Sequence, residues 1–590
     1  MKERILIKVL MAMILAIILA KFIHIEGDPW AIKSTSDIHD EAWWAENAKL
    51  KIQENKWIKD DIAGGVAVSP VINLIYYCSF KLFGINFFSL RIFSVLASIF
   101  NILLYYLLSK RYLLSEKNAL VSTLLFASLP TYFIIGRTGL LETGLISILL
   151  ISILLVLQNN YWLIFFAGVS TAIGIQIKGS YLFLIPIIIY LLYSKNNGTI
   201  KKELFFFCIG FIIVSLSFYL FYYIPNLSVF QAYYTAFEIE FYTLKELLNP
   251  AGIVVRLGYL FSKETFTDPF VFLMILLLIY RIIYFKSDKE TNNLMLGFLF
   301  GFACTLFSDF NDKRILLICI ILPIFLSNSF SDKGTLNLKM LRSVAFFCSF
   351  SLFPFMPIIQ LIGWEEPYLV GISIDSILLF TVFLIIAFTI FFQLERSKKY
   401  IAVVKFVYFL LILVFLSRTL SIIISTQLHF NIETVYLTAI AAICIGSIYW
   451  LLIKQIMSFN HLVLIIIGIQ ISYISFQLLT DTFEIRKLNL IFAKMGKPNE
   501  RIIGPNSIFE ISFLSNTHPI YFSNNGNISK GISTNDVKWF GAITNIEYSE
   551  QNLETDLKLA EKNLKIHFEP YYFQKIYNNK YKALLFKRLD

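Results

Sequence analysis

The residues with the clearest chemical potential are two adjacent carboxylates near the N-terminus. The segment from 36 to 48 reads SDIHDEAWWAENA and holds Asp40 and Glu41 at the start of an expected helix. A carboxylate at a helix N-terminus is favoured by the helix dipole, and a general base that takes a proton from a hydroxyl or amine must be ionised. Taken alone, this window favours simple capping of the helix by Asp37, Asp40 and Glu41. The motifs found further along the chain, described below, favour the base over simple capping.

Four cations further along the chain form a second candidate group. Arg137, Lys178, Lys313 and Arg314 fall at the same expected side of the membrane as the acidic pair. Ionisable residues at membrane depth are costly and usually face a cavity or one another. A lipid phosphate would suit them, because Arg binds it through two parallel hydrogen bonds and Lys binds it as a point charge.

Each cation also has an ordinary explanation. Lys178 and Arg137 could extend to the lipid headgroups, and Arg137 could pair with Glu142 across about one helical turn. The cations at 313 and 314 could form a surface ion cluster with the aspartates at 309 and 312. His39, beside Asp40, could contact substrate or a metal, although a lone histidine usually does neither.

The elements that position these residues are membrane spans. The chain has 590 residues, of which 57% are hydrophobic, and its mean hydropathy is +0.69. Most Lys and Arg residues lie between apolar runs, where basic residues set the orientation of membrane spans. The net charge of +11 therefore predicts no nucleic-acid partner. The six cysteines lie in or beside apolar segments without metal-ligand spacing. The lipid bilayer is therefore the expected partner, and the expected location is the cell (plasma) membrane.

The apolar runs predict an all-α polytopic protein with about fifteen transmembrane helices over residues 1–480. The N-terminus is placed in the cytoplasm, because the breaks assigned to the inner side carry the basic residues, such as Lys110, Arg111, Lys201 and Lys202. An odd number of spans puts the C-terminus outside. The expected spans are 5–23, 88–109, 118–136, 139–157, 161–177, 180–194, 204–224, 266–284, 293–307, 315–330, 343–363, 370–393, 400–417, 434–453 and 459–479.

Two segments are expected outside the membrane. A first outer loop, about 24–87, is longer than a connector requires, and such loops are usually functional. Residues 481–590 are predicted to form a small extracytoplasmic α/β domain, with strands near 501–504, 519–522 and 582–586 and a helix over 552–564. No catalytic motif stands out in that domain, so a role as lid or scaffold is favoured.

An ordered set of motifs resembles the GT-C superfamily of membrane glycosyltransferases, in the branch of protein O-mannosyltransferases and aminoarabinose transferases. The matching elements run from residue 40 to residue 323. They are Asp40-Glu41-Ala42-Trp43, Ser69-Pro70-Val71, Phe83-Gly84, Arg91, the segment from Gly136 to Glu142, Lys178-Gly179, Lys313-Arg314 and Leu322-Pro323. Ser69 stands where the family usually has proline, and Glu142 stands where aspartate is commoner.

The resemblance implies transfer of a sugar from a polyprenyl-phosphate-linked donor to a glycan, lipid or protein acceptor on the extracytoplasmic face, with inversion at the anomeric carbon. It implies Asp40 or Glu41 as the base. The donor phosphate would bind Lys178, Arg137, Arg91, Lys313 and Arg314, and the substrate would contact Glu142, His39 and Trp43. A transporter or flippase of lipid-linked saccharides is the alternative, although no internal repeat of the transporter kind is found.

No metal site is predicted from the residues. Some members of the superfamily use a divalent ion, which leaves such a cofactor open. Asp40 and Glu41 alone supply fewer oxygen ligands than a divalent cation needs.

Overall fold

The structure is a computed structural model. It describes residues 2–27, 40–55, 57, 69–113, 115–139, 141–194 and 200–236, scattered positions within 293–327 and 467–478, and most of 484–589.

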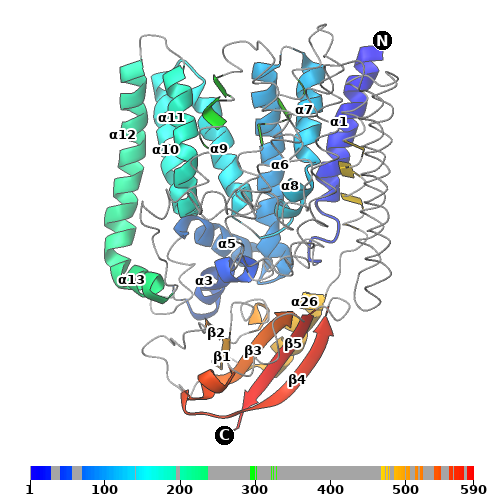
Figure 1. The fold of residues 1–590 in the computed structure, drawn as a ribbon, viewed down its shortest axis with the longest axis vertical. Helices are drawn as coiled ribbons and strands as arrows, with labels where there is room; N and C mark the ends of the chain where they lie inside the picture. Colours follow the sequence, from blue (N-terminus) through cyan, green and yellow to red (C-terminus); the bar gives the residue numbers. More distant parts are fainter. Residues whose placement is uncertain are drawn as a thin grey trace, which may run out of the picture.

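A bundle of roughly parallel helices forms the larger part of the molecule (Figure 1). Apolar side chains with a helical period predict such packing, and the core of the bundle is built from Leu, Ile, Phe and Tyr side chains of successive helices. The helices of the bundle are α1 (Lys2–Ala20), α6 (Phe87–Tyr112), α7 (Glu116–Ala127), α8 (Pro130–Ile135), α9 (Glu142–Val156), α10 (Tyr161–Ile177), α11 (Ile185–Ser194) and α12 (Ile200–Phe218).

Two helices of the first loop lie across one end of this bundle, between it and the C-terminal sheet (Figure 1). They are α3 (Asp40–Glu54) and α5 (Pro70–Phe83). Helix α5 begins with a proline, which needs no hydrogen bond there, and ends at Gly84 with a φ of 76°. The Phe-Gly element therefore ends the helix with a residue that tolerates a left-handed conformation.

Several helix boundaries differ from the sequence-based ones. The run expected as one span over 118–136 is divided into α7 and α8 at Pro130, because proline lacks the N–H and restricts the preceding residue. The run expected over 180–194 opens with a 3₁₀ segment, η2 (Gly179–Leu184), before α11. Helix α12 is followed by a π-helical turn, η3 (Tyr219–Tyr223), then η4 (Ile224–Asn226) and α13 (Leu227–Ala236).

The outer faces of the bundle are suited to lipid. Two helical stretches, 87–112 and 200–231, are long and apolar enough to cross a membrane, and three shorter apolar helices cover 142–156, 161–177 and 181–194. On α12 the side chains of Phe205, Ile212 and Ile213 are all more than half exposed. Exposed apolar patches of this kind are unusual on a soluble protein.

The C-terminal part contains a five-stranded mixed sheet with strand order β2-β1-β3-β5-β4. The strands β1 and β2, and β1 and β3, are parallel, whereas β3–β5 and β4–β5 are antiparallel. Helix α26 (Glu484–Met495) precedes the sheet. The strands are β1 (Arg501–Gly504), β2 (His518–Tyr521), β3 (Val537–Asn545), β4 (Phe568–Ile576) and β5 (Tyr581–Arg588).

The expected strands near 501–504, 519–522 and 582–586 correspond to β1, β2 and β5, and helical residues are found at 557–562 within the expected helix. Strands β3 and β4 were missed. The expected spans at 266–284, 343–363, 370–393, 400–417 and 434–453 lie outside the described residues, and those at 293–307, 315–330 and 459–479 are described only at scattered positions.

Candidate active site

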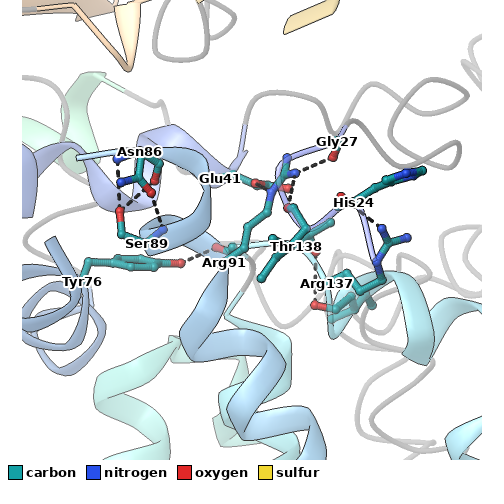
Figure 2. Close-up of polar contacts among 12 residues, drawn as sticks. His24, Gly27, Glu41, Tyr76, Asn86, Ser89, Arg91, Arg137 and Thr138 are labelled. Atoms are coloured by element: carbon teal, nitrogen blue, oxygen red, sulfur yellow. Dashed lines mark hydrogen bonds and ion pairs between the residues drawn. The ribbon is translucent and has the colours of Figure 1, made fainter. Parts of the chain in front are cut away.

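Arg91 and Glu41 form a buried ion pair between the second span and the first loop. A capping box of Asn86 and Ser89 begins α6, and this places Arg91 in the second turn, facing α3. Its Nε donates to Oε2 of Glu41 at 2.8 Å, and the two side chains are only 4% and 3% exposed. Its Nη1 also donates to the carbonyl oxygens of Ile25 and Gly27, after α1 (Figure 2). Arg91 thus joins three segments at one end of the bundle.

Lys178 and Glu142 form a second ion pair at the same end of the bundle. Lys178 follows the last residue of α10, and Glu142 is the first residue of α9. Both positions suit their charges, because cations are favoured at helix C-termini and anions at N-termini. Nζ of Lys178 donates to Oε1 of Glu142 at 2.6 Å, and the lysine side chain remains 17% exposed. The ammonium lies 5.7 Å from the ring centroid of Trp44, which belongs to α3.

Tyr76 of α5 lies near the carboxylates of both pairs. Its hydroxyl donates to the carbonyl oxygen of Gly139 (Figure 2), and its side chain is 1% exposed. Burial raises the pKa of this phenol, and the negative charges of Glu41 and Glu142 raise the pKa further. A neutral hydrogen-bond donor is therefore fixed close to both carboxylates.

The contact made by Ser69 gives a reason for serine at a position where the family usually has proline. Its hydroxyl donates to the carbonyl oxygen of Ile177 at 2.5 Å, and the side chain is buried. The bond ties the start of α5 to the end of α10, beside Lys178. Proline has no donor and could not make it.

Arg137 lies nearby but is held differently. The guanidinium is 1% exposed, and its Nη2 donates to the carbonyl oxygens of Ile23 and His24 at 2.5 and 3.2 Å (Figure 2). Its Cζ also lies 5.4 Å from the ring centroid of Phe133. The residue therefore anchors the turn after α1 to the segment after α8.

The remaining predicted residues are placed as follows. Trp43 packs with its ring 4.6 Å from that of Trp44. Asp40 is the first residue of α3, and its side chain lies outside the described part of the chain. His39, Lys313 and Arg314 also lie outside the described residues. Among the residues that the structure does describe, no group of three His, Cys, Asp or Glu side chains could hold a metal ion.

Sequence reasoning missed Trp44 and Tyr76. Trp44 is next to the tryptophan that the family pattern includes, and only the rotation of α3 decides which ring meets Lys178. Tyr76 lies in an apolar run in which nothing marks one tyrosine above another. Contacts over 63 residues, as between Tyr76 and Gly139, leave no local signal.

The fold and this site define a polytopic membrane protein with buried ion pairs at one end of its helix bundle. A family model described as dolichyl-phosphate-mannose-protein mannosyltransferase matches residues 67–222. That range contains α5, α6 and the segments that carry Arg137, Glu142 and Lys178. Over this range the chain is similar to a family of membrane glycosyltransferases, which agrees with the resemblance that the motifs predicted.

Two solved structures are similar over nearly the whole chain. ArnT from Cupriavidus metallidurans in the apo state gives a TM-score of 0.56 at 11% identity, covering 99% of this chain and 98% of that one. The same protein bound to undecaprenyl phosphate gives 0.53 at 10% identity, covering 98% and 97%. At this identity the likeness concerns the fold. No curated protein sequence matches the chain.

Proposed function

We propose that the protein transfers a sugar from a polyprenyl-phosphate-linked donor to an acceptor at the extracytoplasmic face of the membrane. The observation that carries the proposal is that the Arg91–Glu41 and Lys178–Glu142 pairs converge at one end of the bundle, under the first-loop helices. The match of residues 67–222 to a mannosyltransferase family model supports the reaction class. The undecaprenyl phosphate bound by ArnT supports a lipid phosphate as the carrier.

The proposed reaction is a direct displacement. An acceptor oxygen or nitrogen bonds to the anomeric carbon as the bond from that carbon to the phosphate oxygen breaks, and attack from the opposite face inverts the configuration. The acceptor proton passes to a first-loop carboxylate, Asp40 or Glu41, and the polyprenyl phosphate leaves as an anion. Cations that are already in place stabilise charge as it develops.

Glu41 has features that a base requires. Its Oε2 is fixed by Arg91, while its Oε1 is buried and makes no hydrogen bond within the described part of the chain. That oxygen is available to accept a proton. Asp40 is adjacent on the first turn of α3 and remains the competing candidate.

Lys178 is suited to the leaving phosphate. An ammonium has three donors, and the contact with Glu142 uses one of them. Its partial exposure leaves the others accessible. The neighbouring Trp44 ring fixes the ammonium in position, and a cation–aromatic contact contributes about 0.5–2 kcal/mol.

The test compares wild type with Asp40→Asn and Glu41→Gln. Each purified protein in detergent receives a radiolabelled polyprenyl-phosphate sugar and a membrane extract from the source cells, and label transferred to any acceptor is counted. The variant that lacks the base should lose at least about 10²-fold in transfer. The other carboxylate variant serves as its matched control, and Lys202→Met, on the exposed face of α12, checks for non-specific damage.

The labelled product identifies the acceptor class. Full transfer by both carboxylate variants would contradict the proposed base. If the wild type transfers no label but moves the lipid-linked sugar across a vesicle membrane, the protein is a transporter and the proposed function is wrong.

A further inference from the structure

The turn that follows α1, residues 21–27, carries the backbone groups that hold Arg91. The carbonyl oxygens of Ile25 and Gly27 both accept hydrogen bonds from its Nη1 (Figure 2). Through its Nε the same guanidinium donates to Oε2 of Glu41 at 2.8 Å. A guanidinium is rigid and planar, so its donors keep a fixed relation to one another. A shift of the two carbonyl groups therefore changes how Arg91 presents its Nε to Glu41.

The backbone of this turn has an uncommon conformation. His24 has a φ of 51°, in the left-handed region that residues other than glycine seldom occupy. Such conformations persist where the surrounding structure holds them, and they gather at functional sites. Here the carbonyl oxygen of His24 accepts from the N–H of Gly27 at 2.8 Å and from Nη2 of Arg137 at 3.2 Å. Arg137 thus fixes the first half of the turn.

Glu26 connects the second half of the turn to the C-terminal part of the chain. It stands between Ile25 and Gly27, the two residues whose carbonyl oxygens hold Arg91. Its Oε2 lies 2.5 Å from Nη1 of Arg486, which belongs to α26. The ion pair therefore restrains the peptide units on both sides of Glu26 from outside the helix bundle.

The exposure of this ion pair argues against a role in stability alone. The side chain of Arg486 is 40% exposed and that of Glu26 is 27% exposed. Water screens pairs of this kind, and they contribute little to the free energy of unfolding. Such a pair can still fix a position, and displacement of a catalytic group by about 1 Å can slow a reaction by about 10²-fold. The alignment of the candidate base is therefore the property that the pair can change most.

We propose that Glu26 and Arg486 are positioning residues for sugar transfer, which hold the turn in the conformation that directs Arg91 at Glu41. Because Asp40 is adjacent on the first turn of α3, the same alignment places either candidate base. Helix α26 thereby acts on the chemistry through a second residue, without touching the reacting atoms. The effect on transfer rests on the proposed function, whereas the effect on the turn does not.

The test compares wild type with Glu26→Gln, Arg486→Met and the double variant, each as the full-length protein in detergent. Lys487→Met is the matched control, because it removes a charge from the next, exposed position of α26. Initial rates of label transfer to the membrane extract, at increasing concentrations of the radiolabelled polyprenyl-phosphate sugar, give kcat and the KM for the donor. Hydrogen–deuterium exchange over residues 21–27 and thermal unfolding are measured on the same preparations.

Each single variant should lower kcat by about 10-fold or more. The KM for the donor should be unchanged, because Lys178, the cation assigned to the donor phosphate, belongs to the other ion pair. The double variant should lose no more than either single variant, since residues that act through one contact are not additive.

Exchange should rise in the turn, including at the N–H of Gly27, while the melting temperature stays within about 4 °C of wild type. Lys487→Met should match wild type in every measurement. A purely structural role of the pair would lower the melting temperature and would not change kcat at constant KM.

Two outcomes would overturn the proposal. One is a wild-type kcat in both single variants. The other is a loss in the double variant equal to the product of the two single losses, which would show that the side chains act separately. If the wild type itself transfers no label, the proposed function has failed, and exchange in the turn then decides the positioning role by itself. A rise in Arg486→Met would support that role, and no change would contradict it.

Discussion

Each of the two ion pairs is neutral as a whole, which changes how its cation can act. A phosphate that approaches Lys178 meets an ammonium already shared with Glu142, so attraction at long range is small. The carboxylate fixes where the ammonium stands, and fixed donors cost no reorganisation when charge develops. We therefore expect Lys178 to stabilise the leaving phosphate at short range, from a position that Glu142 fixes.

Lys178→Met tests this at the residue scale. The variant leaves Glu142 buried without its cation, and breaking a buried pair in this way costs about 3–5 kcal/mol. The double variant Lys178→Met/Glu142→Gln removes both charges, so it should recover most of that stability while remaining inactive in transfer. Thermal unfolding in detergent and label transfer, measured on the same preparations, separate the two effects.

The exposed Lys202→Met again provides the control, and it should match wild type in both measurements. If the double variant regains transfer, the role of Lys178 is only to neutralise the carboxylate of Glu142. A single variant as stable as wild type would mean that the pair contributes nothing to the fold.

The residue types of the site were predictable and their pairing was not. Lys178 was singled out because charge at membrane depth demands an explanation. Glu41 was singled out as one of two adjacent carboxylates, and Arg91 and Glu142 were singled out by the family resemblance. Which carboxylate meets which cation depends on contacts over 50 residues for Arg91–Glu41 and 36 for Lys178–Glu142.

At the scale of elements, the sequence predicted a helix boundary correctly where a particular residue caps or ends the helix. Gly84 ends α5, and Asn160 caps α10 by accepting from Trp162 N at 2.9 Å. Strands β3 and β4 escaped detection because each contains a residue that argues against a strand, Gly541 or Pro570. The structure accommodates Pro570 because β4 is an edge strand, and its register shifts next to that proline.

The packing of α10 on α12 depends on two glycines. A Cβ at Gly168 would lie 2.1 Å from the carbonyl oxygen of Phe207, and one at Gly210 would lie 2.2 Å from that of Phe165. Small residues let membrane helices approach this closely. Gly168→Ala should therefore push the two helices apart and lower stability by about 1–3 kcal/mol, as measured by thermal unfolding in detergent.

Gly144→Ala on α9 is the matched control, because a Cβ there would make only ordinary contacts, at 3.8 Å or more. That change should stabilise the helix by about 0.5–1 kcal/mol. Equal effects of the two substitutions would contradict the close approach of α10 and α12.

At the scale of the whole molecule, one short segment of the C-terminal domain packs directly against the helices of the site. Phe513 is fully buried, and its ring centroid lies 5.9 Å from that of Phe80 on α5 and 5.2 Å from that of Phe87 on α6. The Phe87 ring in turn lies against Arg91, 5.4 Å from its Cζ. The domain therefore supports the arginine that holds Glu41.

A buried lysine joins the same segment to α3. Nζ of Lys49 donates to the carbonyl oxygen of Ser512 at 3.0 Å and lies 3.5 Å from Oε2 of Glu46. Burial lowers the pKa of Lys49, although the charge and hydrogen bond of Glu46 oppose the shift. This contact couples the domain to the helix that carries the acidic pair. The role of lid or scaffold expected for residues 481–590 stays a prediction.

Phe513→Ala should weaken the packing of the C-terminal domain against α5 and α6. Truncating a buried phenylalanine to alanine typically costs about 3–5 kcal/mol, and here the loss falls on the contact between the domain and the first loop. Hydrogen–deuterium exchange should therefore rise at α3 and around residue 514, whose N–H donates to Oδ1 of Asn489 at 3.0 Å. Phe573→Ala is the control, because that ring on β4 is 52% exposed. If exchange at α3 is unchanged in Phe513→Ala while sugar transfer persists, the domain folds beside the site without supporting it.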